Sequence, residues 1–370
     1  SMIPVNEPLI SGNAKKYVLD CIESGWISSA GSYIDKFEKN FAGFLRTKLA
    51  VTTTNGTSAL HLAIASLGIG PGDEVIIPDL TIISCALAVI YTGAKPVLVD
   101  VDKTTGNIDP AKIEEKISKK TKAIMVVHLY GHPADMDPIL SLAKKYNVKV
   151  IEDAAEAHGA EYKREKVGSL GDIGCFSFYA NKIVTTGEGG MVVTNNEELY
   201  KKAKLLKDLA HSPKRRFLHE EIGFNYRMTN LQAALGVAEL EEVNDYIKKK
   251  RWMAKLYIEG LKDIPDIELP KEMSYAKSVY WMFPLKVTND SPVKRDQFRE
   301  KLKELGIDTR DFFYPLHSQP VLRDLGLFKE EEYPISSDLS ERGFYIPSGL
   351  ALTEKQVSKV IEAIKKVART

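Results

Sequence analysis

Short apolar runs alternate with amphipathic segments through the first half of the chain. Seven runs rich in valine and isoleucine recur before residue 196, and helical patterns such as ALHLAIASLG and DPILSLAKKYN separate several of them. The runs are LAVTT, EVIIP, PVLVD, KAIMVVH, VKVIED, CFSF and MVVTN. Continuous apolar strands that alternate with amphipathic helices are typical of a mostly parallel sheet covered on both faces. The pattern therefore predicts an α/β domain built on a mostly parallel, seven-stranded sheet.

Helices and a second, smaller unit are expected outside this sheet. Helical patterns occupy residues 13–24, 33–45, about 197–209 and most of 229–261. Pro265 and Pro270 then interrupt the pattern, and short strands mixed with two helices follow them. We therefore expect a large α/β domain with an N-terminal arm over residues 1–245 and a small α+β domain over residues 246–370.

Composition narrows the class of protein without identifying it. The chain has 51 Lys plus Arg and 50 Asp plus Glu, so its charge gives no reason to expect binding to nucleic acid or to an anionic membrane. No apolar run reaches the roughly 18 residues of a membrane helix, and SMIPVNEPL lacks the features of a signal peptide. The cysteines Cys21, Cys85 and Cys175 form no CxxC pair and are expected to be reduced and buried. We therefore expect a cytoplasmic protein.

One lysine occupies a position where a charge is costly. Lys182 lies between the runs CFSF and MVVTN, just before the glycines 187, 189 and 190. A lysine between two buried strands needs a partner or a chemical role. A desolvated amine of lowered pKa can condense with an aldehyde, and pyridoxal phosphate (PLP) is the commonest such aldehyde. Lys182 is therefore a candidate Schiff-base lysine; the alternative is a loop lysine that points to water.

Polar residues suited to such a cofactor follow three of the predicted strands. Gly56 and Thr57 open a helix after LAVTTT, where free amides and the helix dipole attract a phosphate. Asp153 ends VKVIED, where a carboxylate can keep a pyridine nitrogen protonated, and Glu156 is placed to reach a ring hydroxyl. Ser177 is a second candidate phosphate donor. Ligands gather at the carboxyl ends of strands in open α/β sheets, although helix capping and solvated acids are ordinary alternatives for these residues.

Two other classes of site are less well supported. The segment GIGPGD at residues 68–73 lies between a helix and a strand, which is the wrong context for the phosphate-binding turn of a nicotinamide-dependent oxidoreductase. The histidines of HLYGH at residues 128–132 follow a strand, and nothing nearby completes a set of metal ligands. We therefore expect no metal site.

Five motifs together resemble the DegT-type (DegT/StrS) nucleotide-sugar aminotransferases, which belong to the fold type I PLP-dependent transferases. They are NGTSALHLA, GDEVIIPDLT, EDAAEAHGA, FSFYANKIVTTGEGGMVVTN and NYRMTNLQAALG, and the resemblance covers essentially the whole chain. It implies that Lys182 holds PLP as a Schiff base and that Asp153 pairs with the ring nitrogen. The other cofactor-binding residues that it implies are Glu156 at the ring hydroxyl and Gly56, Thr57, Ser177 and the neighbouring subunit's Asn225 at the phosphate. A homodimer with shared active sites follows from the last of these.

Two segments, IESGWISSAGSYIDKFE and FFYPLHSQP, resemble one branch of the family, the GDP-perosamine synthases. This resemblance implies GDP-4-keto-6-deoxymannose as acceptor and L-glutamate as donor. Candidate substrate-binding residues are Trp26, Arg227, Tyr314 and His317, of which Trp26 and His317 have packing roles as alternatives.

Several alternatives and one departure stay open at this point. The acceptor could instead be a UDP- or dTDP-linked keto-sugar. A PLP-dependent sugar dehydratase is a closer rival than an oxidoreductase, although related dehydratases carry histidine where this chain has Lys182. A non-enzymatic PLP-binding regulator is also consistent with the motifs. The family usually places an aromatic residue on the cofactor ring at the position of Ile82, where an aliphatic group can cover the ring only by dispersion.

Overall fold

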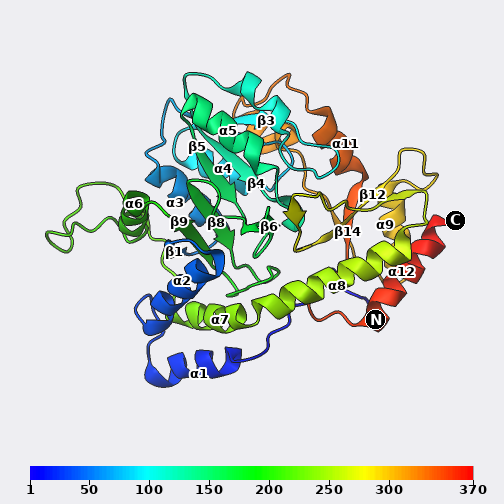
Figure 1. The fold of residues 1–370 in the computed structure, drawn as a ribbon, viewed down its shortest axis with the longest axis horizontal. Coiled ribbons are helices and arrows are strands. Elements are labelled where there is room, and N and C mark those ends of the chain that lie inside the picture. The colour runs from blue at the N-terminus through cyan, green and yellow to red at the C-terminus, as the bar shows by residue number, and fades with distance from the viewer. Residues whose placement is uncertain (370) are drawn as a thin grey trace.

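A seven-stranded sheet organises the larger part of the molecule (Figure 1). The computed structural model describes residues 1–369. The strands are β1 (Leu49–Thr53), β2 (Glu74–Pro78), β3 (Lys95–Val99), β4 (Thr121–Val127), β5 (Lys149–Asp153), β8 (Ile173–Ser177) and β9 (Gly190–Thr194). Their order is β1-β9-β8-β5-β4-β2-β3, and only β9 runs against the others. Each strand coincides with a predicted apolar run, so the predicted fold class is confirmed.

Two apolar cores cover the two faces of this sheet, because side chains alternate along each strand. In β4, Met125 and Val127 belong to one core, whereas Ile124 and Val126 belong to the other. The first core contains side chains of α3 (Gly56–Ser66), α4 (Ser84–Tyr91) and α6 (Glu197–Lys207). The second contains side chains of α2 (Ser32–Leu45), α5 (Met136–Tyr146) and α7 (Asn230–Glu241). The sheet is therefore buried between helices, as the continuous apolar runs predict.

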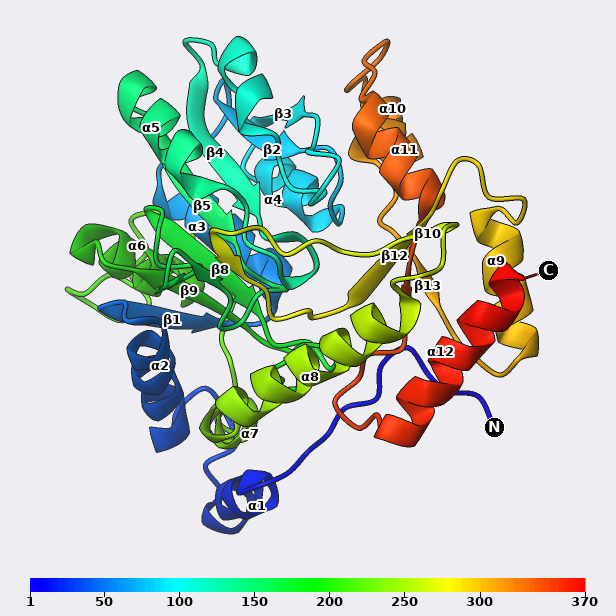
Figure 2. The same ribbon diagram turned by 45° about the vertical axis from the view of Figure 1, so that its right-hand side comes forward.

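A four-stranded antiparallel sheet forms the smaller unit, with the strand order β10-β12-β14-β13. Its strands are β10 (Ile267–Glu268), β12 (Phe283–Val287), β13 (Arg310–Asp311) and β14 (Gly343–Ile346). A third apolar core joins this sheet to α9 (Arg295–Glu304), α12 (Glu354–Ala368) and the second half of α8 (Val243–Leu261). Figure 2 shows α8 running from the large sheet to this unit. A mixed α+β unit thus follows the large sheet, and the boundary after residue 245 stays a prediction.

Shorter elements complete the fold. They are α1 (Ala14–Ser24), α10 (Pro320–Asp324), α11 (Pro334–Arg342), the small sheet of β6 (Glu161–Tyr162), β7 (Glu165–Lys166) and β11 (Ala276–Lys277), and four 3₁₀ turns, Pro110–Lys112, Glu114–Lys116, Leu129–Gly131 and Leu316–Ser318. Within the described range, none of the helices is both long and apolar enough to cross a membrane.

The N-terminal segment ties the two units together. Ile3 forms a bridge with Ile307 of the small unit, and the Ser348 amide donates to the Val5 carbonyl at 3.0 Å. The segment then continues to α1, which packs beside α7 of the large unit. Both labelled ends of the chain lie on the side of the small unit (Figures 1 and 2).

Candidate active site

Six of the predicted site residues line one cavity of about 380 Å³ at the carboxyl edge of the large sheet. They are Gly56, Thr57, Asp153, Glu156, Ser177 and Lys182. They meet because β5 and β8 are neighbouring parallel strands whose ends face the same edge, with Asp153 opposite Cys175. The chemical role assigned to each of the six stays a prediction.

The N-terminus of α3 forms one end of the cavity and suits an anion. The Asn55 side chain accepts from the Ser58 amide at 2.7 Å, so it caps the helix and leaves the amides of Gly56 and Thr57 in its first turn. A Cβ atom placed on Gly56 would lie 2.9 Å from Cβ of Ser177, so glycine allows the helix to approach that hydroxyl-bearing side chain closely. First-turn amides, the helix dipole and a nearby hydroxyl are the donors that a phosphate requires.

A buried carboxylate forms the floor. Oδ1 of Asp153 accepts from the Ala155 amide at 3.1 Å, and Oδ2 accepts from the Cys85 thiol at 3.1 Å. Burial raises the pKa of Asp153, although both donors and the Lys182 amine act against that shift. A carboxylate that has lost its water gains most from a cationic partner such as a protonated ring nitrogen. The sequence had indicated only a buried Cys85, and its bond to Asp153 forms because α4 and β5 share one apolar core.

The lysine amine lies between carboxylates and an aromatic ring. Nζ of Lys182 is 3.9 Å from the ring centroid of Trp281. Burial lowers the pKa of Lys182, and the charges of Glu156 and Asp153 partly oppose this shift. Burial also raises the pKa of Glu156 to about 7, although Lys182 acts against it. Titratable groups shifted toward neutrality in one cavity are typical of acid–base chemistry.

Aromatic side chains that the sequence did not reveal close the cavity. Trp281, Phe313 and Tyr345 line it. Behind them, the Tyr130 ring stacks on Phe313 at 5.4 Å, its hydroxyl accepts from the Phe313 amide, and its own amide donates to Glu156 at 2.9 Å. In the sequence these aromatic residues belong to ordinary apolar runs. Only the packing of the small unit on the large one shows that Trp281, Phe313 and Tyr345 together form one wall of the cavity.

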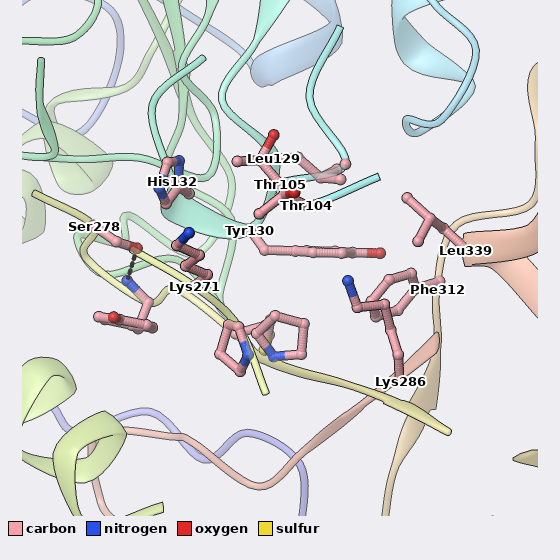
Figure 3. A pocket seen from close by; sticks show the side chains of 15 residues that line it. Thr104, Thr105, Leu129, Tyr130, His132, Lys271, Ser278, Lys286, Phe312 and Leu339 are labelled. Carbon is pink, nitrogen blue, oxygen red and sulfur yellow. Dashed lines mark hydrogen bonds between the residues drawn. The ribbon is translucent and has the colours of Figure 1, made fainter. Parts of the chain in front are cut away.

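A second pocket is lined by Tyr130, whose ring also stacks on Phe313 (Figure 3). Figure 3 shows the Tyr130 ring lying along it, with Phe312 nearby. Its lining is mainly apolar and includes Leu129, Leu339 and the stem of Lys286. None of the predicted catalytic residues lines it, so it is separate from the predicted catalytic site.

His317 does not line the Lys182 cavity of its own subunit. It is buried, and its Nδ1 lies 2.7 Å from Oδ2 of Asp79, while its backbone amide donates to Oδ1 of the same carboxylate. Tyr314, three residues earlier, is 58% exposed and follows the lining residue Phe313. The His317–Asp79 pair thus fixes the loop that presents Phe313 and Tyr314.

The remaining predicted residues lie outside the lining of this cavity; Trp26 and Asn225 are exposed, and Arg227 is half-buried. Trp26 lies in the loop between α1 and α2 and is 58% exposed. Arg227 donates to Oδ1 of Asn225 and pairs with Asp208. None of these side chains lines the cavity, and their contacts with cofactor or substrate stay predictions.

The histidines of the HLYGH segment have other partners. Nε2 of His128 lies 3.0 Å from Oε1 of Glu152, and Nδ1 of His132 lies 2.7 Å from the Pro133 carbonyl oxygen. Across residues 1–369, no group of three or more His, Cys, Asp or Glu side chains is placed to hold a metal ion.

Comparison with known proteins agrees with this geometry. Residues 8–365 match the model of the DegT/DnrJ/EryC1/StrS aminotransferase family. The chain is 45% identical to the GDP-perosamine synthase of Escherichia coli O157:H7, over 98% of this chain and 97% of that protein. It is 44% identical to the GDP-perosamine synthase of Caulobacter vibrioides, over 99% and 98% of the two chains. The solved structure of the PLP form of Spr1654 from Streptococcus pneumoniae superposes with a TM-score of 0.93 at 26% identity, covering 100% of this chain and 99% of that one.

The raised pKa of Glu156 predicts a pH-dependent change in stability. The folded protein holds a proton on Glu156 up to about pH 7, whereas the unfolded chain releases it near pH 4.3. Stability therefore falls as pH rises through this window, and Glu156→Gln removes that loss while its amide oxygen can still accept from Tyr130. The melting temperature of the cofactor-free variant, relative to the unmodified protein, should increase between pH 5 and pH 7.5. The exposed control Glu23→Gln should show no such trend, and a flat difference for Glu156→Gln would contradict the assignment.

Proposed function

The chain belongs to the DegT/DnrJ/EryC1/StrS aminotransferase family, and from that premise we propose that it aminates GDP-4-keto-6-deoxymannose at C4, with L-glutamate as donor, to give GDP-perosamine. The protein is a PLP-dependent sugar aminotransferase. The observation that carries this conclusion is the single cavity in which the Lys182 amine lies with Asp153 and Glu156. The similarity to GDP-perosamine synthases along nearly the whole chain supports the choice of sugar and nucleotide.

The residues present fit PLP. We propose that Gly56, Thr57 and Ser177 bind its phosphate, because the amides of α3 and the serine hydroxyl converge where Gly56 has no side chain. Asp153 is the buried carboxylate available to the ring nitrogen, and Lys182 is the amine that attaches the cofactor. When bound, PLP withdraws electrons from the carbon beside the transferred nitrogen and so makes its hydrogen acidic.

The chain's own groups then move protons and exclude water. We propose that Nζ of Lys182, whose pKa burial lowers, takes the proton from one carbon and returns it to another. The negative charge of Asp153 keeps the ring nitrogen protonated, because the two groups pair in a site that has little water. Trp281 and Tyr345 cover the amine and the Glu156 carboxylate from the side of the small unit.

The substrate is proposed to bind where loops and a second subunit meet. Trp26 is an exposed aromatic side chain and Arg227 a half-buried cationic one, and these types of side chain suit a sugar and a diphosphate. Tyr314 stands beside the lining residue Phe313, and we propose that it contacts the sugar nucleotide directly. The role of His317 at the diphosphate stays a prediction, and its bond to Asp79 supports an indirect contribution through the position of Tyr314. Because nucleotide sugars are cytoplasmic metabolites, we propose that the reaction takes place there.

We propose a homodimer with shared sites. Residues 208–227 form an arm held by bridges between Asp208 and Asn225 and between His211 and His219. On this arm Phe217 is 74% exposed and Ile222 is 88% exposed. Exposed apolar side chains of this size favour burial against a protein partner. A two-fold interface would apply the same arm to both subunits, so that each Asn225 reaches the other cofactor phosphate.

The attachment of PLP to Lys182 is testable by mass. Hydride reduction of the PLP-loaded protein should fix the cofactor on the peptide that contains Lys182, and a tag on another lysine would contradict the proposal. Lys182→Ala should lower kcat by at least about 10³-fold, because both the attachment and the proton carrier are lost. The exposed control Lys119→Ala should keep the activity of the unmodified enzyme.

Shared sites predict complementation between inactive subunits. In a heterodimer of Lys182→Ala and Asn225→Ala subunits, one site combines an intact Lys182 with an intact Asn225. Activity per purified heterodimer should therefore rise to about half that of the unmodified dimer, provided that Asn225→Ala alone is damaging. The control pair Lys182→Ala with Asp153→Ala should stay inactive, because both residues serve the same subunit's cavity. Absence of recovery in the first pair would contradict a shared site.

The nucleotide is tested by competition between keto-sugars. GDP-4-keto-6-deoxymannose should give a kcat/KM at least tenfold above those of UDP- and dTDP-linked 4-keto-6-deoxy sugars, a difference of about 1.4 kcal/mol in transition-state binding. Product formation with glutamate can be followed by mass spectrometry. A tenfold preference for a uridine or thymidine substrate would overturn the GDP assignment and leave the aminotransferase activity in place.

A further inference from the structure

Trp281 makes two separate contacts with the segment that carries the reactive lysine. Its ring lies under Nζ of Lys182, with 3.9 Å between the nitrogen and the ring centroid. Its indole N–H donates to the backbone carbonyl of Asn181, the residue before Lys182, at 2.7 Å. One side chain thus contacts the moving end of the lysine and the backbone from which the lysine extends.

Trp281 is itself held firmly from the opposite side. Its backbone carbonyl accepts from Nζ of Lys250 at 2.8 Å, and Lys250 also donates to the Ser348 carbonyl at 2.6 Å. Lys250 is buried in the middle of α8, and Trp281 is 3% exposed. Tyr130 stacks against the indole ring at 6.5 Å. The ring therefore has little freedom to follow the lysine, and the lysine must adapt to the ring.

The rest of the amine's surroundings do not fix its position in the same way. The charges that act on Lys182 are Glu156 and Asp153, and the nearby His158 is kept neutral because burial lowers its pKa to about 3. None of these groups is within hydrogen-bond distance of Nζ among the described residues. Tyr345 of the small unit lines the same cavity. The ring face of Trp281 contacts the amine, with 3.9 Å between Nζ and the ring centroid, and an aromatic face attracts an ammonium group.

We infer that Trp281 is a positioning residue for Lys182: its ring face holds the amine, and its N–H fixes the backbone that carries it. This inference rests on the proposed role of Lys182. A reactive lysine is a free amine during part of each transamination cycle, and it must return to the same place to attach the cofactor again. The indole supplies that place through contacts that do not involve substrate, so the effect should appear in both halves of the reaction.

Two variants separate the two contacts. Trp281→Phe keeps an aromatic face but loses the N–H, whereas Trp281→Leu loses both and keeps an apolar side chain. The apparent pKa of Lys182 is measured on the cofactor-free protein from the pH dependence of its acetylation, quantified by mass spectrometry. The rate of attachment is measured by absorbance after PLP is mixed with the cofactor-free protein, and hydride reduction identifies the lysine. Trp252→Leu, at a 37% exposed position of α8, is the matched control.

We expect the pKa of Lys182 in Trp281→Leu to lie about half a pH unit or more below that in Trp281→Phe, because only phenylalanine offers a ring face to the ammonium form. Both variants should attach PLP more slowly than the unmodified protein, by about fivefold or more, and Trp252→Leu should change neither quantity. Equal pKa values in the two variants, or unchanged rates, would overturn the inference. A lower melting temperature without a change in pKa and rate would assign Trp281 a purely structural role and overturn it as well. Attachment of PLP to another lysine in the unmodified protein would instead refute the proposed function.

Discussion

The parallel pairing of β5 with β8 is the interaction on which the site depends. It sets Asp153 opposite Cys175, so that the carboxylate and the loop after Ser177 leave the sheet at the same edge. The antiparallel return through β9 then brings Gly190 against the backbone of Asn55, where a side chain would collide with the start of α3. An acid, an amine and a helix N-terminus that are distant in sequence thereby share one cavity.

The same strand shows how two adjacent acids come to have different roles. Glu152 and Asp153 point to opposite faces of β5 because side chains alternate along a strand. Glu152 accepts from His128 and from the amides of Gly168, Leu170 and Gly171, and these bonds outweigh burial and lower its pKa. Asp153 has fewer donors and a raised pKa. The fold itself therefore satisfies Glu152, whereas Asp153 is the carboxylate that we propose to pair with the cofactor ring.

The local sequence was enough to predict those parts of the structure whose geometry follows from the periodicity of apolar residues. The seven apolar runs predicted the strands, and the rule that ligands gather at strand ends was enough to group Lys182 with Asp153 and Ser177. The sequence did not predict contacts between segments that are distant along the chain. The partner of His317 is Asp79, 238 positions away, and the aromatic wall of Trp281 and Tyr345 exists only because the small unit packs on the large one. No local pattern distinguishes such a residue from an ordinary core aromatic.

The wall has a consequence for the order in which the molecule can become functional during synthesis. The strands of the large sheet and Lys182 are complete once residue 194 has left the ribosome, and that sheet can begin to fold from the N-terminus. Tyr345 lies on β14, and the N-terminal bridge of Ile3 needs Ile307 as its partner. A nascent chain shorter than about 346 residues therefore lacks the part of the wall that Tyr345 contributes to the cavity of Lys182. The cavity around that amine is therefore completed only near the end of chain synthesis.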